Sequence, residues 1–259
     1  MKLSSAHAII ILYFLSTLLI LFAVSTILYQ YIAALGSLSE VIKAIGEYRI
    51  LSALWLSITS SIGATIVALL LGIPLAYVFA TKDFLWKSMV ETLVIDVPQT
   101  FPPVAEGIIL LLMLGPTSPI GLNLAFTFAA LVIAKVFIAG PFVVSFVSRK
   151  FREIRKSGMN LTARSLGADQ FQVFTTIFLP LSFNEIAAGA AMCWARAMGE
   201  LGGSLIFAGV IIGQTETIPT FVATNSQTLL IPSLAASILV TTASALALFS
   251  FKRLMAKGE

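Results

Sequence analysis

Residues 159–180 read MNLTARSLGADQFQVFTTIFLP and lie in the most polar part of an otherwise apolar chain, between apolar runs at 122–148 and 178–212. Ala163 and Gly167 are four positions apart, which would place them on one face of a helix where another backbone can come close. Gly167 is expected to end or break that helix. Pro180 interrupts or begins the next one, because proline lacks an amide donor and is tolerated in a first turn. The stretch therefore predicts a helix, a turn and a second helix at a membrane surface.

The rest of the chain is too apolar for a water-soluble globular enzyme. Of its 259 residues, 58% are hydrophobic and 11% are charged, and the mean hydropathy is +1.00. A helix needs about 20 mainly apolar residues to cross the hydrocarbon of a bilayer. Runs of that length recur six times, at 8–32, 53–80, 92–114, 122–148, 178–212 and 231–251. We therefore expect an all-α membrane protein with six transmembrane helices, and we expect the first run to be retained, because it is longer than the core of a signal peptide.

The scarcity of cysteine and histidine limits the kinds of site that the chain can form. One cysteine, Cys193, and one histidine exclude an internal disulfide framework and a multi-histidine metal cluster. The net charge of +4 comes from basic residues in short segments between apolar runs, which indicates membrane topology rather than nucleic-acid binding. We expect no metal, no bound cofactor and no catalytic residue.

The distribution of Lys and Arg orients the chain, because basic residues near the ends of spans stay in the cytoplasm. With the N-terminus inside, only Lys43 and Arg49 face out. The internal set is Lys2, Lys82, Lys87, Arg149, Lys150, Arg152, Arg155, Lys156, Arg164, Lys252, Arg253 and Lys257. The sequence thus predicts one multi-pass domain over 1–259 in the cell membrane, with both termini cytoplasmic and a cytoplasmic loop at about 149–177. The external segment at about 31–53 is expected to be a spacer, with a short amphipathic surface helix as the alternative.

The cytoplasmic loop resembles the EAA loop of ABC-importer permeases, which reads Glu-Ala-Ala, then Gly four residues on, then Ile-x-Leu-Pro. Here the matching residues are Leu161-Thr162-Ala163, Gly167 and Ile177-Phe178-Leu179-Pro180, with Leu161 in place of the glutamate. The resemblance implies a type I importer permease fold, a homodimer, and a coupling helix docked in a cleft of each of two copies of an ATPase subunit. The residues that would form the coupling loop are Leu161, Thr162, Ala163, Arg164, Leu166, Gly167, Phe171 and Pro180.

Charged residues inside spans are functional candidates, because a charge in the bilayer is costly unless it is paired. They are Asp96, Glu106, Lys135, Glu185, Arg196 and Glu200. Asp96 and Glu185 are expected near the internal ends of their spans. Glu106 follows two prolines that disrupt the third span, so it is either a wall of the pathway or bonded to a neighbouring helix, for example through Lys135. Arg196 and Glu200 are four apart and are expected to form an ion pair, with direct contact to substrate as the alternative.

The glycines around Glu200 allow a kink or close helix packing, as a gate requires. The expected pathway and gate residues are Glu106, Arg196, Gly199, Glu200 and Gly202. This region resembles the molybdate, tungstate and sulfate branch of the permeases, through Arg196, Ala197, Gly199, Glu200, Gly202, Ala208, Gly209, Gly213, Thr215, Thr217 and Pro219. Leu201, Gly203 and Ser204 replace the usual Phe, Ala and Thr, which leaves the identity of the oxyanion open.

The resemblance implies a permease that passes a tetrahedral oxyanion inward from an external binding protein by alternating access. The chain has no Gly-x-x-x-x-Gly-Lys-Ser/Thr phosphate loop, so a separate ATPase must hydrolyse ATP. An ion-coupled secondary transporter that uses Glu106, Lys135, Arg196 and Glu200 is the main alternative. An intramembrane enzyme is disfavoured, because the spans hold no His-Glu pattern and no pair of aspartates.

Overall fold

The computed structural model describes residues 5–256, and every regular element in that range is helical. The first half of the chain forms α1 (Ser5–Leu35), α2 (Leu38–Ile45), α3 (Tyr48–Thr81), α4 (Lys87–Glu91), the π-helical turn η1 (Thr92–Asp96), α5 (Val97–Thr100) and α6 (Pro103–Leu114). The second half forms α7 (Phe128–Lys156), α8 (Met159–Ser165), α9 (Gln170–Val173), η2 (Phe174–Phe178), α10 (Leu179–Leu181), α11 (Phe183–Met198), η3 (Ser204–Ala208), α12 (Ile218–Asn225) and α13 (Leu230–Ala256). Lys2 and Lys257, two of the basic residues expected in the cytoplasm, lie outside the described residues.

Four of the expected spans are single helices that are long and apolar enough to cross a membrane: Ile9–Leu35, Tyr48–Thr81, Phe128–Lys156 and Leu230–Phe251. The other two are bent pairs, Lys87–Thr100 with Pro103–Leu114 at 117° and Gln170–Leu181 with Phe183–Met198 at 69°. The described residues therefore hold six crossings if each bent pair counts as one. The fifth expected span was wrong at its end, because α11 stops at Met198 rather than near residue 212.

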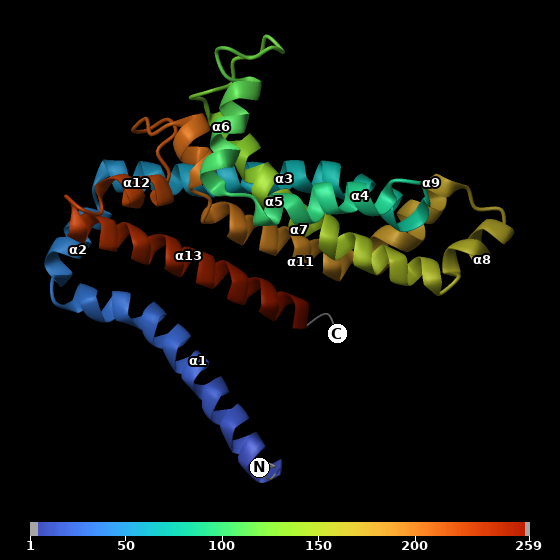
Figure 1. Cartoon of the computed structure of the whole chain (residues 1–259), viewed down its shortest axis with the longest axis horizontal. Helices are drawn as coiled ribbons and strands as arrows, with labels where there is room; N and C mark the ends of the chain where they lie inside the picture. Colours follow the sequence, from blue (N-terminus) through green and yellow to red (C-terminus); the bar gives the residue numbers. More distant parts are fainter. Residues whose placement is uncertain (1–4, 257–259) are drawn as a thin grey trace.

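The bend in the third span follows from its two prolines. A residue before proline is pushed out of the helical region, and Phe101 and Pro102 are both extended, with ψ of 136° and 123°. Pro103 then starts α6, where the missing amide costs nothing because a first-turn amide has no partner within the helix. As a result α6 projects away from the long axis of the bundle (Figure 1).

The main core lies between α3, α7 and α11. Ala64, Ala68, Gly72 and Ala76 recur at every fourth position of α3 and are buried. A Cβ on Gly72 would lie 3.2 Å from side-chain carbons of both Val143 and Val144 on α7, so the two helix backbones are close. Small residues at such crossings are the usual means by which membrane helices approach each other.

The segment at about 31–53 that we expect outside contains the helix α2 and is not a plain spacer, so that expectation was wrong. Val41 and Ala44 of α2 are buried in a second core with Ala235 and Ala236 of α13. One face of α2 is apolar, as the alternative proposed, but that face packs on the bundle. By contrast, α1 diverges from the other helices (Figure 1) and leaves its apolar side chains exposed until its last turn, where Ala34 joins the second core.

Figure 1 also shows how the two ends of the bundle are occupied. The helices α2 and α12 lie at one end, and α8 and α9 lie at the other. From the first of these ends, α13 runs back along the bundle in the direction of α8. The expected loop 149–177 therefore begins in the last turns of α7 and forms one end of the molecule.

Candidate functional site

The helix α6 crosses the 199–209 segment with its backbone in contact. A Cβ on Gly107 would lie 2.7 Å from Cβ of Ile206 and 2.8 Å from the carbonyl oxygen of Gly202, distances that real Cβ atoms do not adopt. Gly202 in turn lies against the backbone of Pro103, so a side chain there would also collide. The close packing expected from these glycines is present at Gly202, and Gly199 is exposed at the end of α11.

Glu106 sits at this crossing without a polar partner. Its side chain is 1% exposed, and neither carboxylate oxygen has a hydrogen-bond partner among the described residues. Its Oε1 lies 2.9 Å from the position that a Cβ would take on Gly203. The bond to Lys135 that was offered as one reading does not form within the described part of the chain.

Lys135 of α7 is fully buried and is held by α3 instead. Its ammonium donates to Oγ of Ser60 at 2.7 Å, to Oγ of Ser61 at 3.0 Å and to the carbonyl oxygen of Ser57 at 3.3 Å. The Ser57 hydroxyl accepts from the backbone amide of Ile218 at 2.8 Å, so α3 joins α7 and α12 through one polar cluster. Sequence reasoning singled out Lys135 but did not find these three serines.

The expected ion pair between Arg196 and Glu200 is not formed in the described part of the chain, and that prediction was wrong. It required a continuous helix, but α11 ends at Met198. Glu200 instead accepts from the backbone amides of Gly203 at 2.8 Å and Ser204 at 3.0 Å, and from the Ser204 hydroxyl. The carboxylate thus satisfies the free amides at the start of η3, as an N-terminal helix cap does.

The Gly-x-Thr-x-Thr-x-Pro stretch after η3 builds a loop and the start of α12. Gly213 has a φ of +74°, a conformation that favours glycine. The Thr215 hydroxyl donates to the carbonyl oxygen of Gly209 at 3.1 Å, and Thr217 caps α12 together with Thr220. Pro219 occupies the first turn of α12. These motif residues are therefore explained by the structure of the loop itself.

Glu216 lies in the same loop and forms an ion pair that sequence reasoning missed. Its buried carboxylate accepts from Nη2 of Arg49 at 2.6 Å and from Nε at 2.9 Å. The Arg49 guanidinium also lies 5.1 Å from the ring centre of Phe221 in α12. No spacing rule could have found this pair, because the partners are 167 positions apart.

The loop at about 149–177, which we expect in the cytoplasm, has the expected helix, turn and helix. Gly167 follows the end of α8 at Ser165 with a φ of +94°, so it breaks the helix as expected but does not share a helical face with Ala163. The turn ends at Asp169, whose side chain accepts from the amide of Gln172 at 2.8 Å and so caps α9. Pro180 begins the short helix α10.

The two sides of this loop differ in their surroundings. Leu166 and Phe171 are 85% and 73% exposed. Ala163, Ala168 and Phe174 pack on the main core. The aromatic rings of Phe174 and Phe178 meet that of Tyr77 edge to face, with centroids 5.0 and 5.1 Å apart, so the loop is fixed to α3. All the expected coupling residues lie on the segment from α8 to α10. They are Leu161, Thr162, Ala163, Arg164, Leu166, Gly167, Phe171 and Pro180.

The remaining candidates are peripheral. Asp96 is exposed at the end of η1, and the Glu185 carboxylate lies 3.7 Å from the Lys150 ammonium at the start of α11. Arg196 is half-buried and makes no ion pair with any described residue. The described residues also hold no group of three or more His, Cys, Asp or Glu side chains that could bind a metal.

Comparison with known proteins identifies the family of this chain. A family model described as binding-protein-dependent transport system inner membrane component matches residues 68–257. The chain belongs to this family. Among its relatives, the molybdate/tungstate permease WtpB of Thermococcus kodakarensis is 34% identical over 74% of this chain and 78% of its own. The molybdenum permease ModB of Haemophilus influenzae is 33% identical over 69% and 80%. The sulfate permease CysW of Synechococcus elongatus is 30% identical over 71% and 66%.

Solved structures support the fold of this inner membrane component. A bacterial ABC transporter that imports alginate matches with a TM-score of 0.66 at 14% identity, over 95% of this chain and 96% of its own. The methionine ABC transporter MetNI matches with a TM-score of 0.58 at 14% identity, over 81% and 96%. The chain has the type I ABC importer permease fold, and it is a multi-pass protein of the cell membrane.

Proposed function

We propose that this permease forms the membrane path of an ATP-driven importer for a tetrahedral oxyanion, either molybdate or tungstate, with sulfate as the third candidate. The observation that carries the proposal is its similarity to molybdate and tungstate permeases over about three quarters of the chain. The match to a sulfate permease keeps sulfate among the candidates. An external binding protein would deliver the anion and supply most of the selectivity.

Energy would come from a separate ATPase, two copies of which dock on two copies of this chain. The form of the loop supports this assignment, because Leu166 and Phe171 are exposed while Ala163 and Phe174 pack on the core. A partner that seats on the exposed side can move the bundle through the packed side. Such coupling is a difference in the partner's affinity for two conformations of the bundle.

Alternating access would take place where α6 crosses the 199–209 segment. The close contact of Gly107 and Gly202 would close the path at this crossing, and opening would separate the two segments. Glu106, Arg196, Gly199, Glu200 and Gly202 remain our proposed pathway and gate residues. A homodimer is supported by α1, most of whose apolar span is left uncovered by its own chain.

The bias of basic residues supports an orientation with both termini and α8 in the cytoplasm. Arg149, Lys150, Arg152, Arg155 and Lys156 all lie at the end of α7 that leads into α8. The end with α2 and α12 would then face the external binding protein. We assign no cofactor to this chain, since ATP is used by the partner subunit.

The substrate is tested by competition in proteoliposomes that contain the permease, its ATPase and its binding protein. Labelled molybdate should enter when ATP is enclosed with the ATPase, and unlabelled tungstate should compete at similar concentration. If sulfate competes as well as tungstate, and the binding protein binds molybdate no more tightly than sulfate, the assignment to molybdate and tungstate is wrong.

The docking role is tested by replacing Gly167 with Trp. Space around the Cα is open, so the bulky side chain does not disturb the core, although the φ of +94° costs about 1–2 kcal/mol for a residue with a Cβ. The variant should keep its fold, bind ATPase poorly and lose ATP-driven uptake. Gly167→Ala is the matched control, since it carries the same backbone strain without the bulk. Normal uptake by Gly167→Trp would contradict the docking role.

An ion-coupled carrier remains the second candidate, because Glu106 is a buried carboxylate without a described partner. Intramembrane carboxylates of this kind serve as relays or ion ligands in secondary transporters. Uptake driven by an imposed proton or sodium gradient would favour this function.

A further inference from the structure

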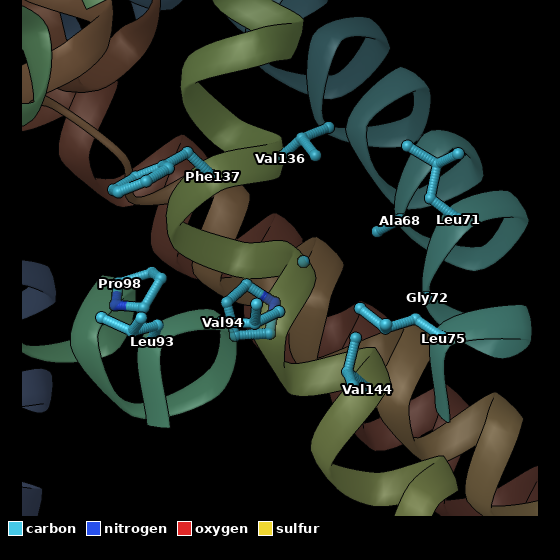
Figure 2. Close-up of a pocket in the computed structure, with 12 residues that line it drawn as sticks. Ala68, Leu71, Gly72, Leu75, Leu93, Val94, Pro98, Val136, Phe137 and Val144 are labelled. Carbon is cyan, nitrogen blue, oxygen red and sulfur yellow. The ribbon is translucent and has the colours of Figure 1, made fainter. Parts of the chain in front are cut away.

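An apolar cavity opens between α3, α7 and the segment that contains η1 and α5 (Figure 2). Its volume is about 310 Å³, and its walls include Ala68, Gly72 and Leu75 of α3 with Leu93 and Pro98 of the third span. Every residue that lines it is apolar. The cavity thus offers no side-chain donor to an anion and suits a hydrocarbon chain.

A second cavity of about 310 Å³ lies between the same three segments. Apart from Ala80 at the end of α3, its lining residues are all basic: Lys87, Arg152, Arg155 and Lys156. Lys87 starts α4, and the other three lie in the last turns of α7. This cavity is therefore suited to a negatively charged group.

The basic cavity follows the apolar one along α3 and α7, and on the third segment it comes first, at Lys87 before Leu93, because α4 lies nearer α9 than α5 does (Figure 1). On α3 the basic cavity begins at Ala80, five residues beyond Leu75, which corresponds to about 8 Å of helix. On α7 it begins at Arg152, eight residues beyond Val144, or about 12 Å. The basic cavity thus lies one to two helical turns nearer the end of the bundle, as a headgroup lies beyond the start of its acyl chain.

Charge at the basic cavity is only partly balanced within the described residues. Lys87 and Arg155 share the carboxylate of Asp83, at 3.1 and 2.7 Å. Arg152 lies 2.7 Å from a carboxylate oxygen of Glu91. Lys156 is exposed and has no ion pair with a described residue. Four cations against two carboxylates leave two positive charges in excess at this site.

We propose that the two cavities form one binding site for an anionic phospholipid. The phosphate occupies the basic cavity beside Lys156, and an acyl chain lies in the apolar cavity beside Leu93. Basic pockets between membrane helices bind anionic headgroups by the same combination of charge and burial. A free oxyanion would fill only the basic cavity, whereas a phospholipid occupies both, which is why we assign the site to a lipid.

Native mass spectrometry of the purified full chain tests the site. The protein is titrated with phosphatidylglycerol and with phosphatidylcholine of identical chains, which differ in headgroup charge. Phosphatidylglycerol should bind at one high-affinity site per chain, and phosphatidylcholine more weakly. Equal affinity for the two lipids would overturn the proposal.

Two variants test separately how the headgroup and the acyl chain of the lipid contribute to binding. Lys156→Gln should weaken the binding of phosphatidylglycerol by about fivefold, because one cation near the phosphate is lost. The binding of phosphatidylcholine should weaken much less, because its choline cation already offsets the charge of its phosphate. Arg253→Gln removes an exposed cation from the end of α13, outside both cavities, and is the matched control. Leu93 lines the apolar cavity and is half-exposed, so a larger side chain there can be accommodated. Leu93→Trp should narrow the cavity and weaken the binding of both lipids. Equal effects of Lys156→Gln and Arg253→Gln would contradict the site.

The same titrations test whether a free anion or a second copy of the chain occupies the site instead. Inorganic phosphate in excess should not displace phosphatidylglycerol, and displacement would identify a site for a free anion instead. If Leu93→Trp abolishes association between two copies of the chain without changing lipid affinity, the cavity belongs to a subunit interface and the proposal is wrong.

Discussion

Arg49 at the start of α3 holds Glu216 of the loop before α12 through two guanidinium nitrogens, with Nη2 2.6 Å and Nε 2.9 Å from the carboxylate. Glu216 is fully buried, and the Arg49 side chain is 32% exposed. This contact fixes a loop to the first long helix of the core. It therefore sets the geometry at the end of the bundle that carries α12.

Replacing Arg49 with Ala should destabilise the protein by about 2–4 kcal/mol, because the buried carboxylate of Glu216 loses its counter-charge. Arg49→Lys should recover only part of the loss, since an ammonium cannot reproduce the two-pronged contact. The midpoint of thermal unfolding in one detergent measures both variants. Equal stability of Arg49→Ala and the parent protein would show that water replaces the guanidinium at no cost.

Ser60 and Ser61 should matter more for stability than Lys135, which donates a hydrogen bond to each of them. Lys135→Met should change the free energy of unfolding by less than about 1 kcal/mol, because each serine hydroxyl keeps a carbonyl acceptor on its own helix. Ser60→Ala with Ser61→Ala leaves the buried ammonium with one long hydrogen bond and should cost about 2–3 kcal/mol. Adding Lys135→Met to the double variant should restore stability. Failure of that rescue would contradict the account of the cluster.

Gly107 and Gly199 form a matched pair for testing the crossing of α6. Gly107→Ala should cost about 1–3 kcal/mol, because its Cβ would overlap Ile206 and the Gly202 backbone. A Cβ on Gly199 would lie no closer than 3.9 Å to a neighbouring residue, at the carbonyl oxygen of Arg196, so Gly199→Ala should be nearly neutral. Chemical or thermal unfolding of the two variants side by side checks the difference. Equal costs would mean that the crossing is not tightly packed.

Asp83 should add an acid-dependent part to stability. The Arg155 guanidinium, and then the Lys87 ammonium, hydrogen-bond its carboxylate and lower its pKa from 3.8 to about 2. A carboxyl group with a lowered pKa stabilises the fold above its ordinary pKa, and this contribution is lost as the pH falls from about 4 to about 2. The stability difference between the parent protein and Asp83→Asn should therefore shrink over that range. A difference that stays constant with pH would contradict the pairing.

The sequence predicted the spans well, because the length of an apolar run is a local property. It also located the break near Pro102 and Pro103 and the turn at Gly167, where one residue type dictates the backbone. The partners of Lys135 and Arg49 could not be predicted, since they are 75 and 167 positions away and depend on how helices pack. The predicted ion pair of Arg196 with Glu200 assumed that one helix continues through both residues. The helix α11 ends at Met198 instead, and no proline in the sequence marks that end.

We expect this permease to move its substrate only when a nucleotide-hydrolysing partner drives the loop around α8. Uptake of labelled molybdate into proteoliposomes, with the binding protein outside, measures it directly. Molybdate should enter when the ATPase subunit and enclosed ATP are present, and should not enter when the ATPase is omitted, whatever proton or sodium gradient is imposed. Uptake by the permease without the ATPase, rising with an imposed gradient, would contradict it.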